Sequence, residues 1–95
     1  MPLRILLIDD LRVFPEVTAT ARTYAEGILL LREGAPWDEL WLDHDLGEEK
    51  SGYDVMCWIE EHPELLPGSI RLVTANPVGR ERMDLVIRKL YGLPI

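Results

Sequence analysis

The chain has 95 residues, of which 47% are hydrophobic and 28% are charged, and its formal net charge is −7. That length holds one hydrophobic core, so we expect a single domain over residues 1–95, and the composition argues against a disordered chain. The acidic balance argues against direct nucleic-acid binding, which depends on Lys and Arg side chains that neutralise phosphates. A protein partner, or a phosphate-containing small molecule held through a metal, remains compatible with this charge.

Four short apolar segments predict four strands, and helical patterns follow three of them. The strands are expected at about residues 3–9, 17–22, 39–43 and 70–74. The helices are expected at about residues 23–33, at 53–62, and from Pro77 to just before Gly92. Strands that alternate with helices are typical of βα units and of a mostly parallel sheet.

The predicted helices carry start signals. Thr23 with Glu26 forms a capping box, and Asn76 followed by Pro77 combines an N-cap with proline at the first helical position. The connection between the first two strands is the exception. It has about seven residues, fewer than the dozen or more that a parallel crossover usually takes. Either the first helix of the fold is missing, or the segment 17–22 is a poor strand at the edge of the sheet.

Two acidic clusters close two of the apolar segments: Asp9-Asp10, and Asp43-His44-Asp45. Ligands of open α/β sheets collect outside the carboxyl ends of the strands. Clustered carboxylates repel one another unless a cation or a shared proton is present, and oxygen ligands favour Mg²⁺, Ca²⁺ or Mn²⁺. We therefore expect a metal site there. The alternatives are a solvated acidic turn for the first cluster and a loop cap for Asp45.

Polar side chains at a third strand end predict a phosphate-binding half of the same site. Thr74 supplies a hydroxyl, and Asn76 begins a helix whose free N–H groups suit a phosphate. Arg80 lies in the first turns of that helix, where a cation opposes the helix dipole unless an anion binds. Arg12, near the first cluster, is either a phosphate ligand or a neutralising partner. For Asn76, a plain N-cap is the alternative.

The order of strands and of the polar residues that follow them resembles the receiver domain of response regulators. It resembles more closely a divergent branch, the cyclic-phosphate-processing receiver-like family. The matching segments are 8–12 (IDDLR), 22–24 (RTY), 42–47 (LDHDLG), 51–55 (SGYDV) and 75–80 (ANPVGR). The resemblance implies a small three-layer α/β fold, receiver-like (flavodoxin-like), with a mostly parallel sheet of four to five strands. Its first helix is expected to be reduced, and its C-terminal strand lost or very short.

The residue patterns and the resemblance together predict roles for individual residues. The metal, Mg²⁺ or Mn²⁺, is expected on Asp9, Asp10, Asp43 and Asp45; the catalytic residues are expected to be Asp43, His44, Thr74 and Arg80; and the phosphate ligands are expected to be Arg12 and Asn76. Asp43 lies where receivers carry the phosphorylated aspartate, and Thr74 matches the hydroxyl residue that contacts the phosphoryl group. The implied activity is on a cyclic phosphate or cyclic nucleotide.

Two departures keep a second function open. Receivers carry a lysine at the end of a fifth strand, whereas here the only lysines are Lys50, in a predicted loop, and Lys89, in the last predicted helix. Val73 stands where the branch tends to carry a histidine, so His44 would have to transfer protons instead. The alternative to a metal-dependent phosphoesterase is therefore a non-catalytic binding or regulatory module, such as a phage protein that binds to a basic surface of a host protein.

No apolar segment approaches the ~20 residues of a membrane span, and no charged-then-apolar leader opens the chain. We therefore expect a cytoplasmic protein.

Overall fold

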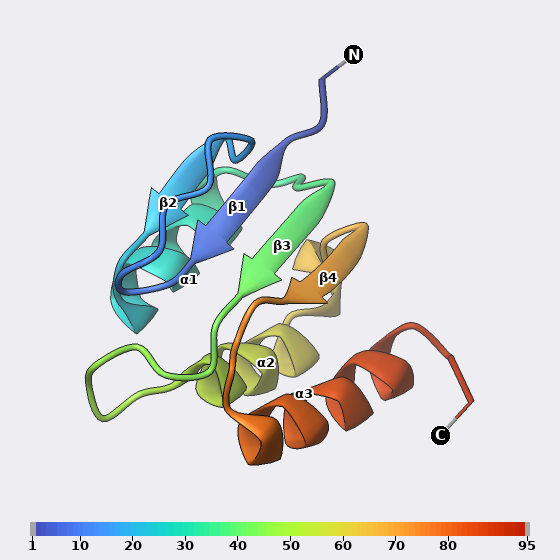
Figure 1. The fold of residues 1–95 in the computed structure, drawn as a ribbon. Coiled ribbons are helices and arrows are strands. Elements are labelled where there is room, and N and C mark those ends of the chain that lie inside the picture. The colour runs from blue at the N-terminus through green and yellow to red at the C-terminus, as the bar shows by residue number, and fades with distance from the viewer. Residues whose placement is uncertain (1, 95) are drawn as a thin grey trace.

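The computed structural model describes residues 2–94 and contains four strands, three α-helices and one short 3-10 helix. In chain order these are β1 (Ile5–Ile8), β2 (Ala19–Ala21), α1 (Tyr24–Glu33), β3 (Glu39–Leu42), α2 (Gly52–Glu61), η1 (Pro63–Leu65), β4 (Ser69–Leu72) and α3 (Pro77–Leu90) (Figure 1). All the predicted strands and helices are confirmed, and η1 is the one element that the sequence pattern did not predict. None of the helices between residues 2 and 94 has both the length and the apolar character that crossing a bilayer requires.

The strands form one parallel sheet in the order β2-β1-β3-β4. The register places Ile8 of β1 opposite Leu42 of β3, and Leu42 opposite Leu72 of β4. Three strands therefore end at the same level, and the arrowheads in Figure 1 all point toward the same edge. The polar segments that follow these strands consequently emerge side by side.

The predicted helix starts are confirmed. The Thr23 hydroxyl accepts a hydrogen bond from the backbone N–H of Glu26 at 3.1 Å, which caps α1. The Asn76 side chain accepts one from the N–H of Gly79 at 3.0 Å, with Pro77 as the first residue of α3. Each bond satisfies an N–H group that the helix itself leaves without a partner.

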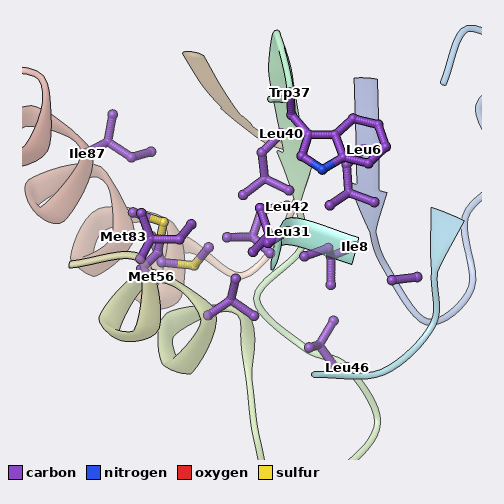
Figure 2. Packing of buried hydrophobic residues seen from close by; sticks show 13 residues of the cluster. Leu6, Ile8, Leu31, Trp37, Leu40, Leu42, Leu46, Met56, Met83 and Ile87 are labelled. Atoms are coloured by element: carbon purple, nitrogen blue, oxygen red, sulfur yellow. The ribbon is translucent and has the colours of Figure 1, made fainter. Parts of the chain in front are cut away.

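All three helices cover one face of the sheet, where the main core lies. Its buried residues include Leu6, Ile8, Leu40 and Leu42 from the sheet, and Leu31, Met56, Met83 and Ile87 from the helices (Figure 2). The alternate residues of β1 and β3 point to this face because side chains along a strand alternate between the two faces.

The opposite face carries no helix within residues 2–94. Ile5, Leu7 and Trp41 are nevertheless buried there, packed against Phe14 and Val17 from the connection between β1 and β2. The Phe14 and Trp41 rings meet edge-on, with centroids 5.2 Å apart. The expected third layer is thus a loop and not a layer of helices. The connection between β1 and β2 has too few residues to form a helix on this face. It is nevertheless long enough to cover the three buried side chains.

The described chain ends without a fifth strand, as predicted. Tyr91 follows α3 and holds the end of that helix to the body of the domain, because its hydroxyl donates a hydrogen bond to the carbonyl oxygen of Pro67 at 2.7 Å. Burial raises the pKa of Tyr91 to about 12 from its ordinary value of 10.0.

The free energy of unfolding should therefore fall less steeply with rising pH in the Tyr91→Phe variant than in the wild type. A raised pKa means that folding favours the neutral phenol, so this contribution is complete below pH 10.0 and is lost as the pH rises toward about 12. Urea unfolding of both proteins across this window measures the difference. Parallel profiles would show that the hydroxyl is not buried as described.

Candidate functional site

Three carboxylates converge beyond the carboxyl ends of β1 and β3. Asp9, Asp10 and Asp43 each offer a carboxylate oxygen, and these oxygens lie within 4.8 Å of one another. Asp9 is fully buried and Asp43 is 8% exposed. Three negative charges so close, two of them out of water, need a positive partner, and the oxygen donor set fits a hard divalent cation.

A tight turn directs the neighbouring side chains Asp9 and Asp10 to the same place. One carboxylate oxygen of Asp9 accepts hydrogen bonds from the backbone N–H groups of Leu11, at 2.9 Å, and of Arg12, at 3.0 Å. The chain therefore bends immediately after β1. Two consecutive residues of a continuing strand would have pointed to opposite faces.

The surroundings of Asp43 raise the pKa of its carboxyl group. Burial is the main cause, and the negative charge of Asp9 adds to it; a hydrogen bond from Thr74 and the positive charge of Arg12 act in the opposite direction. Ionised Asp43 is therefore held in a place that disfavours its charge, which a bound cation would relieve.

Arg12 is the positive partner of the cluster within the described chain. One of its guanidinium nitrogens lies 3.3 Å from Asp9 and 3.7 Å from Asp43, and it also donates a hydrogen bond to the carbonyl oxygen of Val73. Its side chain is 40% exposed, so it has room to move. The structure thus places Arg12 as a neutralising partner in the cluster, at a position from which it also reaches the end of β4.

We expect the variant Arg12→Gln to bind Mn²⁺ more tightly and to be less stable without metal. Removal of a cation next to the carboxylates raises their attraction for Mn²⁺, by roughly 1 kcal/mol or about fivefold in affinity, because the 40% exposed guanidinium is partly screened by solvent. The same change leaves Asp9 and Asp43 without their partner. Calorimetric titration and thermal melting measure the two effects, with exposed Arg82→Gln as the matched control. Weaker Mn²⁺ binding by Arg12→Gln would contradict the neutralising role.

Arg22 is a site residue that the sequence pattern gave no reason to choose. It follows β2, and one guanidinium nitrogen donates to the carbonyl oxygens of Asp9, at 3.0 Å, and of Arg12, at 2.7 Å. Arg22 therefore holds the turn that carries two of the carboxylates. Its only signal in the sequence was the family segment 22–24, since contacts between side chains and distant backbone leave no periodic pattern.

Thr74 and Asn76 lie beside the carboxylates, at the end of β4. Thr74 is 6% exposed, and its hydroxyl accepts a hydrogen bond from the Asn76 backbone N–H at 3.1 Å. The Thr74 side chain lies close enough to Asp43 to lower the pKa of that carboxyl group, so the ends of β3 and β4 meet here. Asn76 is an N-cap, as its alternative interpretation predicted, and its amide nitrogen also approaches Asp45 at 3.5 Å.

His44 and Asp45 form a separate pair next to the three-carboxylate cluster. The imidazole Nδ1 of His44 lies 3.0 Å from a carboxylate oxygen of Asp45, and this hydrogen bond lowers the pKa of Asp45. Gly79 packs directly on the imidazole, because a Cβ atom at that position would lie 2.5 Å from the ring. Asp45 was expected on the metal, but its oxygens contact His44 and Asn76 and lie outside the cluster of Asp9, Asp10 and Asp43.

Arg80 lies on the outer side of β4. Its guanidinium donates to the carbonyl oxygens of Leu72, at 3.4 Å, and of Thr74, at 3.2 Å, and it makes no ion pair with a carboxylate in residues 2–94. The two lysines are elsewhere: Lys50 lies over an aromatic ring of α1, and Lys89 pairs with an acidic side chain of α2. Neither lysine is among the residues that contact the carboxylate cluster in residues 2–94.

Comparisons with known proteins agree with this arrangement. The model of one family, described as the cyclic-phosphate processing receiver domain, matches residues 4–89. A solved fusion protein, whose title names the yeast Spc42 trimeric coiled coil (amino acids 181–211) joined to another structure, superposes with a TM-score of 0.71 and 19% identity. The match covers 90% of this chain and 63% of the fusion chain, and at that identity it shows the fold alone. A search of curated proteins gives no match.

Proposed function

The chain belongs to the cyclic-phosphate processing receiver domain family, and from that premise we propose that it binds a divalent cation, Mg²⁺ or Mn²⁺, and hydrolyses a cyclic phosphate beside it. The observation that carries the proposal is the convergence of Asp9, Asp10 and Asp43 within 4.8 Å. The buried hydroxyl of Thr74 at the next strand end adds a donor for a phosphoryl oxygen.

In this proposal a bound divalent cation supplies Lewis-acid polarisation of the phosphoryl oxygens. The chain contributes position and charge. Asp9, Asp10 and Asp43 hold the cation, and Thr74 donates a hydrogen bond to a phosphoryl oxygen. Arg12, at the edge of the cluster, is placed to move from the carboxylates to the phosphate and to stabilise negative charge that develops there.

His44 is the residue we propose for proton transfer to the leaving oxygen when water attacks the phosphorus atom and the P–O bond of the ring breaks. Its contact with Asp45 and its packing on Gly79 restrict the orientation of the imidazole. Asp45 therefore has a different role in the proposal from the one its sequence position suggested. It orients His44, and the three carboxylates of the cluster suffice to hold the metal together with water, as Mg²⁺ typically requires.

The test is a substrate panel with Mn²⁺: 2′,3′-cyclic, 3′,5′-cyclic and linear phosphates, each incubated with wild type and with His44→Gln. We expect ring opening of at least one cyclic phosphate by the wild type, and a fall in kcat with little change in KM for His44→Gln. That split is expected because His44 acts in the chemical step and not in binding.

The same panel decides between an enzyme and a binding module. Tight binding of a cyclic phosphate by calorimetry, without turnover of any member of the panel, would favour the non-catalytic alternative. The absence of both binding and turnover for every member of the panel would contradict the phosphate site itself.

A further inference from the structure

We infer that a hollow beside β4 is a subsite for the nucleobase of a cyclic nucleotide whose phosphate lies at the carboxylate cluster. The inference rests on the proposed function and narrows its substrate class from cyclic phosphates in general to nucleoside cyclic phosphates. The hollow has a volume of about 490 Å³, within the range of small-molecule sites.

The hollow lies where the sheet ends. β4 is the last strand in the sheet order of the described residues, and α3 runs beside it (Figure 1). The floor is apolar, formed by Ile70 and Leu72 of β4 and by Pro77 and Ile87 of α3. An apolar floor between a strand and a helix suits a flat ring, because burial of its faces removes apolar surface from water.

The free edge of β4 offers the polar groups that would orient such a ring. The backbone N–H groups of Ser69 and Val73 bond to β3, each at 3.0 Å. Ile70 and Leu72, which alternate with them, therefore direct their N–H and C=O groups outward. Arg80 donates to the C=O of Leu72, so the groups of these two residues that a ring could use are their N–H groups and the C=O of Ile70. Backbone donors and acceptors at a strand edge complement the alternating donors and acceptors of a base.

Arg80 connects the hollow to the phosphate site. It lines the hollow, and its guanidinium donates to the carbonyl oxygens of Leu72 and Thr74. Thr74 in turn contacts Asp43 through its side chain. Thr74 and Arg80 therefore link the carboxylate cluster to the hollow.

The rim favours a base over the two other occupants of such a groove. Glu81 supplies an acidic acceptor for an exocyclic amino group and would repel a second phosphate, whereas the carboxylate of Asp84 pairs with Arg88 at 2.9 Å. An added peptide strand would need the outward carbonyl groups of β4, and Arg80 already occupies those of Leu72 and Thr74. A base needs fewer of these groups than a strand does.

The test compares adenosine 2′,3′-cyclic phosphate with glycerol 1,2-cyclic phosphate, which has no base. Binding to the Mn²⁺-loaded protein is measured by calorimetry, and with Mg²⁺ by amide NMR shifts. We expect the nucleotide to bind at least about tenfold more tightly, and its amide shifts to include Ile70 and Leu72. The base-free probe should shift only residues near the carboxylates.

The variant Ile70→Trp fills the hollow, and aromatic residues suit a half-buried strand position. It should lose the preference for the nucleotide while it keeps its affinity for the base-free probe, which also shows that it folds. Leu85→Trp, on an exposed part of α3 that does not line the hollow, is the matched control and should keep the preference. Equal binding of the two probes by the wild type, or an unchanged preference in Ile70→Trp, overturns this inference alone. Failure of both probes to bind overturns the proposed function and this inference with it.

Discussion

The Asp43→Asn variant should lose most of the rise in melting temperature that Mn²⁺ or Mg²⁺ gives the wild type. A ligand that binds only the folded state at 100 times its Kd stabilises it by about 2.7 kcal/mol. For a domain of this size each kcal/mol corresponds to about 4–8 °C, so the wild type should gain roughly 10–20 °C. Asp43 supplies one of the three converging oxygens and lies at 8% exposure, where an amide cannot replace its charge.

A second comparison isolates the cluster from a general loss of negative charge. Asp45→Asn removes a neighbouring carboxylate that lies outside the cluster, so it should keep the metal-dependent gain. Without metal, Asp43→Asn should melt at a higher temperature than the wild type, because burial and the charge of Asp9 both disfavour ionised Asp43. Equal metal-dependent gains in wild type and Asp43→Asn would rule out the cluster as the metal site.

The secondary structure was predictable because each signal is local. Apolar segments such as Leu40 to Leu42 end at a polar residue, and the strand ends with the apolar segment. Thr23 and Asn76 cap helices through hydrogen bonds to residues three positions away. The convergence of Asp9 with Asp43 also followed from the sequence, since carboxyl ends of neighbouring parallel strands share one edge.

What the sequence could not predict depends on contacts between distant residues. The position of Arg12 against Val73 joins residues 61 positions apart, and the hold of Arg22 on the carbonyl oxygen of Asp9 depends on how β2 pairs with β1. Asp45 illustrates the same limit. It was expected on the metal beside Asp43, but the strand ends at Leu42, and the loop that follows directs Asp45 toward His44.

The chain also approaches itself closely behind the site, at a position that no motif of the metal chemistry predicts. Gly52 is the first residue of α2, and its N–H donates to the carbonyl oxygen of His44 at 2.7 Å. A Cβ atom at Gly52 would lie 2.0 Å from the carbonyl oxygen of Asp43 and 3.1 Å from the Cα atom of His44. Those atoms belong to the backbone, so they cannot rotate away as a side chain would.

The Gly52→Ala variant should therefore be severely destabilised. Overpacking in a well-packed core typically costs about 1–3 kcal/mol, and we expect the upper end or more here because the backbone that carries Asp43 must move. At about 4–8 °C per kcal/mol the melting temperature should fall by roughly 12–24 °C. Metal affinity should fall with it, since the displaced carbonyl belongs to the residue whose carboxylate completes the cluster.

Gly92→Ala is the matched control, because it separates conformational strain from crowding. Gly92 has φ +66, but a Cβ atom added there would meet no described atom within 4 Å, so its replacement costs only the left-handed conformation, about 1–2 kcal/mol. Thermal melting of the two variants in the presence and absence of Mn²⁺ should show a large loss with weakened metal binding for Gly52→Ala, and a small loss with unchanged metal binding for Gly92→Ala. If the two variants behaved alike, the first turn of α2 would not press on the metal-site strand, and the position of Asp43 would have to depend on its contacts with Thr74 and Arg12 alone.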